Sequence, residues 1–167
     1  MKINLVKPEK RALNLIWEEG FETRRLVVSL YVCGDAVEMG EVFARPEVWQ
    51  FAKDITSPDA AARWLEWARL DSFHMPFTLR LKNGALAGFL VVIRRGKGTL
   101  ELGGWLSPDL WGQGLAKELI LEIVRHGRMC GGYKKLQAEV DEVHFVAYRL
   151  LQASGFSLQG GVWELDI

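Results

Sequence analysis

Two glycines flank a glutamine in the stretch SPDLWGQGLAKELI (107–120), directly before a segment whose apolar residues have helical spacing. Gly112 and Gly114 allow backbone conformations that turn successive N–H groups into one concavity, and the start of the helix adds unpaired donors and a partial positive charge. Such a junction suits an anion, and phosphate is the usual one. The competing interpretation is a tight turn between a strand and a helix with no ligand.

Two well-known phosphate motifs do not fit this junction. The P-loop pattern is absent, because no glycine in the chain is followed by Lys-Ser or Lys-Thr. The dinucleotide pattern needs glycine or alanine at position 117, where a lysine would spoil close packing of helix on strand. The sequence therefore argues against both kinds of nucleotide site.

Composition restricts the partners. The chain has 167 residues, about one domain, with 49% hydrophobic residues, 25% charged residues and a formal net charge of zero. This balance argues against a nucleic-acid or membrane-surface binder held by bulk charge. Cys33 and Cys130 are too few for a disulfide scaffold. His74 and His126 have no partners at ligand spacing, so we expect no metal.

The N-terminal segment and the apolar runs bear on location. Residues 1–20 carry charges throughout and lack the apolar core of a signal peptide. The longest purely apolar run, Phe89–Ile93, is far shorter than the ~20 residues of a membrane helix. We therefore expect a cytoplasmic protein in which residues 1–167 form one domain, with residues 1–20 as an N-terminal extension of unassigned role.

The elements around the junction follow from periodicity and turn signals. Alternation and β-branched or aromatic residues predict strands at 22–32, 77–82, 85–95, 99–106, 135–141 and 161–167. Helical spacing and capping residues predict helices at 35–43, from Pro46, at 58–70, at 115–128 and at 143–153. Asn83-Gly84 indicates a hairpin, and Gly103-Gly104 inside a strand indicates a bulge or a close backbone approach. This order predicts an α+β (mixed α/β) fold.

With its neighbours, the junction resembles the acyl-coenzyme A signature Q/R-x-x-G-x-G/A of the GNAT family of N-acetyltransferases. Further matching stretches follow in the family's order: ETRRL at 22–26, LKNGALAGFLVV at 81–92, ELGGWLSPDLWGQGLAKEL at 101–119 and VDEVHFVAYRLLQASGF at 140–156. They resemble most the RimJ/RimL branch, which acetylates the N termini of ribosomal proteins. The resemblance implies the GNAT fold, a central mostly antiparallel mixed sheet splayed between two parallel strands, with helices on both faces.

The resemblance also implies acetyl-coenzyme A as the cofactor and direct attack of a primary amine on its thioester. Backbone N–H groups near Trp105 and Leu106 would polarise the thioester carbonyl, and His144 stands where an asparagine usually contacts the pantetheine. The other cofactor-binding candidates are the signature itself: Trp111, Gly112, Gln113, Gly114, Leu115, Ala116 and Lys117. Trp111 departs from the Gln or Arg usual at the first signature position.

Two glutamates are candidates for the general base. Glu139 matches a strand glutamate that has this role in RimI-type relatives, and alternation would place Gln137, Glu139 and Asp141 on one sheet face. A merely solvated face explains these three polar residues equally well. Glu101, in the preceding strand, is a second candidate that would act through water.

The family's usual proton donor is missing. Leu151 stands in place of a tyrosine, Ala147 in place of a serine, and Gln159 in place of a glutamate. His144 could replace the acid, because an ordinary pKa of ~6.5 lets a histidine exchange a proton near neutrality. A histidine at a helix start can also be a plain surface residue.

The cost of deprotonation bears on the acceptor. At pH 7 an α-amine needs about 1 kcal/mol to lose its proton and a lysine about 4.6 kcal/mol, so a weakened proton relay favours the α-amine of a protein N terminus. The alternatives are a small amine (an aminoglycoside, a polyamine or an amino-acid derivative) and a catalytically silent acyl-coenzyme A-binding module. We expect a monomer or homodimer, without a nucleic-acid or membrane partner.

Overall fold

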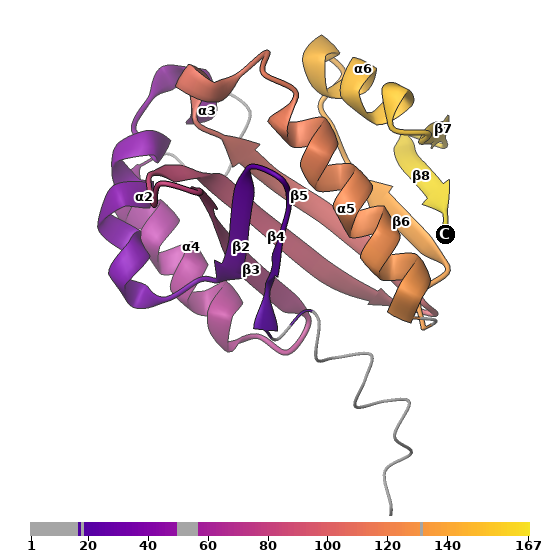
Figure 1. Ribbon diagram of the computed structural model, residues 1–167, viewed down its shortest axis with the longest axis horizontal. Helices are drawn as coiled ribbons and strands as arrows, with labels where there is room; N and C mark the ends of the chain where they lie inside the picture. The colour runs from indigo at the N-terminus through magenta and orange to yellow at the C-terminus, as the bar shows by residue number, and fades with distance from the viewer. Residues whose placement is uncertain (1–16, 18, 50–56, 131) are drawn as a thin grey trace, which may run out of the picture.

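The computed structural model describes residues 17, 19–49, 57–130 and 132–167 (Figure 1). The strands are β1 (Phe21–Glu22), β2 (Leu26–Leu30), β3 (His74–Leu81), β4 (Leu86–Gly96), β5 (Thr99–Leu106), β6 (Lys135–Ala138), β7 (Ser157–Gln159) and β8 (Val162–Asp166). The α-helices are α2 (Ala36–Phe43), α3 (Pro46–Trp49), α4 (Pro58–Leu70), α5 (Leu115–Cys130) and α6 (Phe145–Ala153), with short 3-10 turns η1 (Cys33–Asp35) and η2 (Pro108–Leu110). Within these ranges, no helix has the length and apolar character needed to cross a bilayer.

An eight-stranded sheet organises the molecule, in the order β1-β2-β3-β4-β5-β6-β8-β7. Neighbouring strands are antiparallel except for β5 and β6, which are parallel. Helices α5 and α6 cover one face, and α2 and α4 cover the other (Figure 1). The predicted mixed α/β class, with a mostly antiparallel sheet between two layers of helices, is confirmed.

Strand β4 shows how the sheet divides the core. Successive side chains of a strand point to opposite faces. Leu90 and Val92 join the cluster that packs on α5, whereas Phe89 and Val91 join the cluster that packs on α2 and α4. All four are buried, so β4 is covered on both faces and lies at the centre of the fold.

The local helix signals are confirmed. Ser57 caps α4: its Oγ accepts the Ala60 N–H at 3.1 Å, and Pro58 occupies the first helical position. Helix α5 begins at Leu115 as predicted and runs two residues beyond the predicted end. Helix α3 begins at Pro46, while the rest of the segment predicted there lies outside the described residues.

The predicted strand at 22–32 is wrong as one element, because the chain turns between β1 and β2. The Thr23 N–H donates to the Leu26 carbonyl at 2.9 Å, and the Leu26 N–H donates to Thr23 Oγ1 at 2.9 Å. The N–H of Arg25 leaves the ladder and donates to Glu118 of α5 at 2.8 Å. A contact with a distant helix therefore breaks a segment whose composition alone favours an unbroken strand.

The predicted strand at 135–141 is too long. Strand β6 ends at Ala138, and the Asp141 carbonyl accepts the His144 N–H at 2.8 Å in the turn before α6. Glu139 and Asp141 therefore lie beyond the paired strand. The predicted closing strand is present as β8, and it forms a hairpin with β7, which the sequence pattern did not predict.

The bulge predicted at Gly103-Gly104 is wrong, and the alternative of a close backbone approach is correct. The register with β4 is continuous from Gly88 opposite Leu106 to Arg94 opposite Leu100. Gly104 has a φ of 152°, and a Cβ there would lie 2.3 Å from the Phe89 carbonyl oxygen. Only glycine lets the two backbones approach this closely.

The Asp35 carboxylate ties the start of α2 to the sheet. One of its oxygens accepts the Thr78 hydroxyl at 2.5 Å and the other accepts Arg80 Nη2 at 2.7 Å. Burial alone raises the pKa of Asp35, but the hydrogen bonds from Thr78 and Arg80 outweigh it and hold the pKa below its ordinary value. The resulting stabilisation is complete above the ordinary pKa of an aspartate and is lost as the pH falls through the lowered value.

We expect Asp35→Ala to lower the free energy of unfolding by about 2 kcal/mol, because it leaves the buried Thr78 hydroxyl and the Arg80 guanidinium without their carboxylate. Denaturant unfolding at pH 7 measures this. Glu38→Ala is the matched control, because Glu38 pairs with the same guanidinium at 2.7 Å but is exposed. Its expected cost is below about 1 kcal/mol; equal costs for the two variants would contradict the assignment.

Candidate active site

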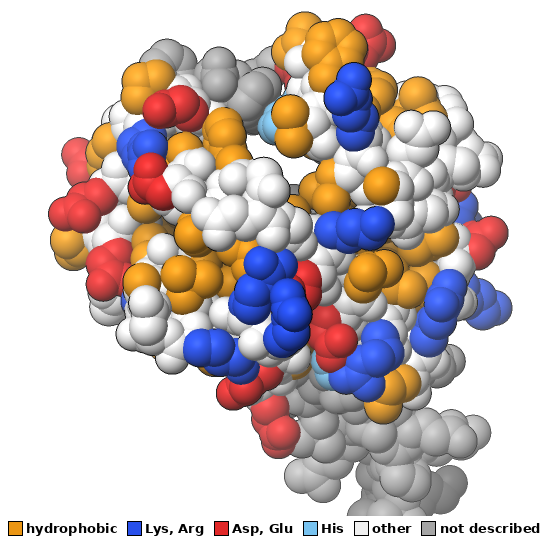
Figure 2. All heavy atoms as spheres, turned by 45° about the horizontal axis from the view of Figure 1, so that its top comes forward, with side chains coloured by type: hydrophobic (Ala, Val, Ile, Leu, Met, Phe, Trp, Pro, Cys, Tyr) orange, Lys and Arg blue, Asp and Glu red, His pale blue; other side chains and the backbone are white. Residues whose placement is uncertain are grey.

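The sheet opens between β5 and β6. Their pairing covers only Thr99–Glu101 and Lys135–Gln137, after which β5 continues to Leu106 while β6 ends at Ala138. Beyond Glu101, the outer edge of β5 therefore has no strand beside it among the described residues. Figure 2 shows the surface hollowed on this side of the molecule, next to α6. A slender group can reach the edge of β5 here.

The glycine junction lies directly after this edge. Gly112 and Gly114 have φ values of 75° and 76°, in the left-handed region that favours glycine. A Cβ placed on Gly112 would meet no atom within 4 Å. No acceptor in the described parts of the chain takes the backbone N–H groups of residues 112–117. A row of unpaired donors beside open space, at the positive end of α5, fits an anionic group such as a diphosphate.

Most side chains of the junction shape the loop. Trp111 Nε1 donates to the Leu106 carbonyl at 2.8 Å, and Gln113 Nε2 donates to the Asp109 carbonyl at 3.1 Å. Leu115 is buried in the core, Ala116 is half-buried, and Lys117 is exposed. In this stretch, the groups that can still contact an anion are therefore the backbone N–H groups and the exposed Lys117 ammonium.

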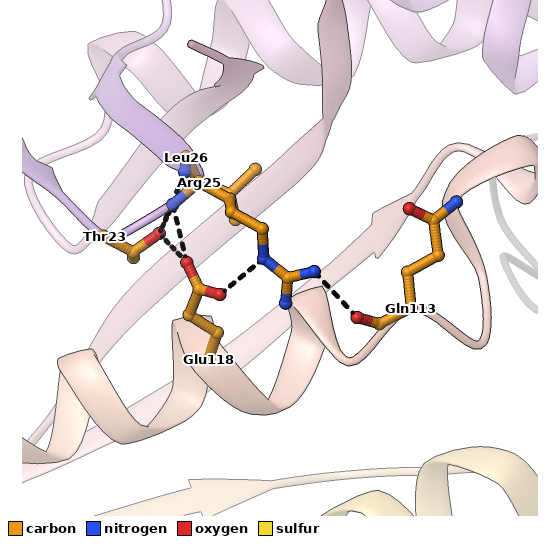
Figure 3. Close-up of polar contacts among 5 residues, drawn as sticks. All are labelled: Thr23, Arg25, Leu26, Gln113 and Glu118. Carbon is orange, nitrogen blue, oxygen red and sulfur yellow. Dashed lines mark hydrogen bonds and ion pairs between the residues drawn. The ribbon is translucent and has the colours of Figure 1, made fainter.

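Sequence reasoning missed the residues that support the junction from the other side (Figure 3). Glu118, in the first turn of α5, accepts the Thr23 hydroxyl at 2.5 Å and both the backbone N–H and Nε of Arg25 at 2.8 Å. Arg25 Nη1 also donates to the Gln113 carbonyl at 2.9 Å. Burial alone raises the pKa of Glu118, but the hydrogen bonds from Thr23 and Arg25 outweigh it and lower the pKa to about 2. The carboxylate is thus fully ionised near neutrality.

The free backbone N–H groups on β5 follow from the strand register. Ser107 donates its N–H to the Ala87 carbonyl of the β4 side at 2.8 Å, and the pairing of β5 with β4 has no shift between residues 100 and 106. Because N–H directions alternate along an antiparallel pair, the N–H of Trp105 also points to β4. Those of Gly104 and Leu106 point to the open edge. Of the predicted pair, Leu106 therefore presents its N–H to the open edge and Trp105 does not, whereas Gly104 does.

Glu101 lies on the sheet face that carries α2 and α4, just before the opening. Its carboxylate accepts two hydrogen bonds from the Arg95 guanidinium at 2.7 Å and one from Gln137 Nε2 at 2.8 Å. Burial alone raises the pKa of Glu101, but these hydrogen bonds outweigh it and hold the pKa below its ordinary value. A carboxylate with three donors and a lowered pKa is a weak base, so the geometry does not favour Glu101 as a proton acceptor.

Glu139 lies one residue beyond the end of β6, at the mouth of the opening. Its side chain is exposed, and its charge raises the pKa of the Arg95 guanidinium, for which the hydrogen bonds to Glu101 are the largest cause. Glu139 and Glu101 are thus brought to the same part of the molecule by the parallel strands. The structure describes no hydrogen bond that occupies the Glu139 carboxylate.

His144 caps α6. Its Nδ1 accepts the backbone N–H of Ala147 at 3.3 Å. Burial lowers the pKa of His144 below its ordinary value. An Nδ1 that accepts a hydrogen bond carries no proton, so the neutral ring holds its proton on Nε2. This geometry suits His144 to donate a hydrogen bond, and it disfavours the proton-shuttling role predicted from an ordinary pKa.

We expect His144 to be neutral at pH 7, with the proton on Nε2, and to titrate below pH 6.5. Nitrogen chemical shifts of the imidazole, followed by NMR as a function of pH, measure both. The folded pKa lies below the unfolded one, so the ring favours folding above pH 6.5 and opposes it as the pH falls. A ring protonated at Nδ1 at pH 7 would contradict the capping role; Ala147→Pro is a control that removes the hydrogen bond on Nδ1 while leaving in place the burial that lowers the pKa.

Two departures from the pattern of the resembled family, Leu151 and Gln159, lie in different environments. Leu151 is buried, with 5% of its surface exposed, in the core cluster beneath α5 and α6, so it offers no proton donor. Tyr148, one turn earlier, packs its ring edge-on against Trp163 at 5.2 Å between centroids. Gln159 is exposed on the edge strand β7, and nothing in the structure explains its difference from glutamate. The described residues contain no group of three or more His, Cys, Asp or Glu that could hold a metal ion.

Comparisons with known proteins agree with this architecture. A family model described as the acetyltransferase (GNAT) domain matches residues 25–157. No curated protein matches the sequence. Among solved structures, an acetyltransferase of the GNAT family from Bacillus anthracis is 15% identical, covers 89% of this chain and 97% of its own, and has a TM-score of 0.75.

Two further structures are coenzyme A complexes. Spermidine N-acetyltransferase from Vibrio cholerae, with coenzyme A and spermine, is 16% identical, with 85% of this chain and 94% of that chain covered and a TM-score of 0.72. The ribosomal-protein α-N-acetyltransferase RimL, with coenzyme A, is 13% identical. The match covers 87% of this chain and 96% of RimL, with a TM-score of 0.75. At these identities the likeness shows a shared fold.

Proposed function

The chain belongs to the GNAT family of acetyltransferases, and from this premise we propose that it transfers an acetyl group from acetyl-coenzyme A to the α-amine of a protein N terminus. The observation that carries the proposal is the row of unpaired N–H groups at residues 112–117, placed at the end of the open edge of β5. The coenzyme A complexes of structures with this fold support it.

Acetyl-coenzyme A supplies the acetyl thioester. The N–H groups of residues 112–117 hold its diphosphate, and Lys117 adds a positive charge at the exposed start of α5. The outward N–H groups of Gly104 and Leu106 hydrogen-bond the thioester carbonyl and stabilise the negative charge that develops on its oxygen. One such donor is worth roughly 2.7–4 kcal/mol of the barrier.

The amine must lose a proton before or during its attack. Glu139 takes this proton at the mouth of the opening, where its carboxylate is exposed. As the C–N bond forms, the C–S bond breaks, and coenzyme A leaves as a thiolate that takes up a proton from solvent. His144 stays neutral and offers a hydrogen bond through Nε2. The proposed proton relay has no tyrosine and only a solvated base. It therefore suits an α-amine better than a lysine, because at pH 7 deprotonation costs about 1 kcal/mol for the α-amine and about 4.6 kcal/mol for the lysine.

A polyamine is the second candidate acceptor. Acidic side chains follow β6 directly, at Glu139, Asp141 and Glu142, and a run of carboxylates attracts a polycation. The V. cholerae structure of this fold with spermine supports this alternative.

An acceptor panel tests the proposal. Purified full-length protein is incubated with acetyl-coenzyme A and peptides with free α-amines and blocked lysines, spermidine, or an aminoglycoside, and thiol release and acetylated products are measured. We expect acetylation of peptide α-amines. Acetylation of spermidine alone would favour the second candidate. Saturable coenzyme A binding without any product would favour a silent binding module, and absence of coenzyme A binding would overturn the proposal.

A further inference from the structure

Arg25 connects the turn between β1 and β2 to both halves of the glycine junction (Figure 3). Its Nη1 donates to the Gln113 carbonyl of the loop at 2.9 Å, and its Nε donates to the Glu118 carboxylate of α5 at 2.8 Å. Its own backbone N–H donates to the same carboxylate at 2.8 Å. The guanidinium is therefore fixed from two sides, with 35% of the Arg25 side chain exposed.

The planarity of the peptide bond makes this contact consequential. In a trans peptide the C=O and the following N–H point in opposite directions. The hydrogen bond from Arg25 draws the Gln113 carbonyl toward the β1–β2 turn, so the N–H of Gly114 is directed away from that turn. Gly114 lies at φ 76° and would otherwise be free to rotate this peptide.

The other contacts of the loop leave this peptide unfixed. The Trp111 indole and the Gln113 side chain bond the carbonyls of Leu106 and Asp109, which anchor the part of the loop before Gly112. Among the described residues, Arg25 is the one whose side chain bonds the Gln113 carbonyl. We propose that Arg25 is a positioning residue that sets the direction of the Gly114 N–H and so shapes the junction for the diphosphate of coenzyme A.

The charge of Arg25 is already used within the protein. The Glu118 carboxylate lies in the first turn of α5, where a negative charge next to a bound diphosphate would be unfavourable. Arg25 and Thr23 donate to it and thereby hold it against the β1–β2 turn. The pair has no net charge, so the effect of Arg25 on ligand binding comes from loop geometry rather than from attraction at a distance.

The inference rests on the proposed binding of coenzyme A at residues 112–117, and its test separates the two claims. We expect Arg25→Gln to weaken coenzyme A binding by about tenfold to a hundredfold, as misplaced positioning groups do, in calorimetric titration of the full chain. The KM for acetyl-coenzyme A rises in parallel, and kcat at saturation stays within about twofold. The KM for S-acetyl-pantetheine, which lacks the diphosphate, is unchanged.

Two variants define what Arg25 does. Arg25→Lys keeps the positive charge, but a single ammonium cannot reproduce the planar guanidinium that contacts Glu118 and the Gln113 carbonyl at the same time. We therefore expect this variant to bind coenzyme A as weakly as Arg25→Gln. Arg24→Gln removes an exposed neighbouring arginine and is the matched control, with affinity within about twofold of the native value. Thermal unfolding is measured for each variant, and affinities are compared at a temperature at which all variants are folded.

The outcomes are distinct. Native affinity in Arg25→Gln would overturn the inference. Full recovery in Arg25→Lys would also overturn it, because a direct charge contact would then explain the loss. A uniform rise in KM for both acetyl-coenzyme A and S-acetyl-pantetheine would indicate a general structural role and would likewise contradict it. If the native protein does not bind coenzyme A, the proposed function itself fails.

Discussion

Gly114→Trp is expected to weaken coenzyme A binding by at least about a hundredfold while the protein remains folded. A side chain at this position requires an L-residue at φ 76° and starts beside Arg25 Nη2, so a bulky ring displaces the contact that fixes the loop and its N–H groups. Losing two charge-assisted hydrogen bonds to the diphosphate, at about 1.5–3 kcal/mol each, accounts for a change of this size. Calorimetric titration with coenzyme A measures it.

The backbone strain of this substitution has a matched control in the β3–β4 hairpin. Gly84 has a φ of 89°, and a Cβ there would meet no atom within 4 Å; a Cβ on Gly114 would meet only Arg25 Nη2 at 3.8 Å. Gly84→Trp therefore carries a similar strain of about 1–2 kcal/mol without touching the junction. We expect both variants to lose similar stability and Gly114→Trp alone to lose affinity. Equal affinities would show that the junction is a structural turn with no anion.

The parts of the fold that sequence predicted correctly are those specified within a few residues. The Ser57 cap, the Asn83-Gly84 hairpin and the start of α5 at Leu115 each depend on neighbours along the chain, so the local pattern contains the information. The glycine junction is in the same class, since its backbone conformation follows from two residues that lack a Cβ.

The errors have the opposite origin. The break at Thr23–Arg25 depends on a carboxylate that is 93 residues away from Arg25 in sequence, so no periodicity within residues 22–32 could reveal it. The acid Glu118 near the start of a helix was visible, but such a residue usually serves the helix dipole, and its partner was not predictable. The same long-range contact explains both the wrong strand and the missed residues of the site.

The direction of the Trp105 N–H could not be predicted, because it depends on the register of β5 against β4. Which backbone N–H groups point outward depends on how β5 pairs with β4, and a shift of one residue exchanges the two sets. The hydrogen bond from the Ser107 N–H to the Ala87 carbonyl determines which set points outward. It places the N–H groups of Gly104 and Leu106 on the open edge. The sequence predicts the strand but does not determine which of its backbone N–H groups point toward β4.

Glu139→Gln is expected to lower kcat/KM for an α-amine by about a hundredfold at pH 7, the lower end of what a general base contributes. The affinity for coenzyme A should not change, because Glu139 lies beyond β6 and the proposed contacts with the diphosphate lie at residues 112–117. The deficit should shrink to less than about tenfold at pH 9, where most of the amine, with a pKa of ~8, has already lost its proton. Steady-state rates from pH 6 to pH 9 measure both.

Glu101→Gln is the isosteric comparison that decides between the two glutamates. Glu101 is buried and bound by Arg95 and Gln137, so its replacement should lower the melting temperature and change kcat/KM by a factor that does not depend on pH. If Glu101→Gln instead shows the deficit that disappears at high pH, the proton passes to Glu101 through water, despite the lowered pKa of that carboxylate. The pH dependence carries the distinction because only the residue that accepts the proton becomes dispensable once the amine is already neutral.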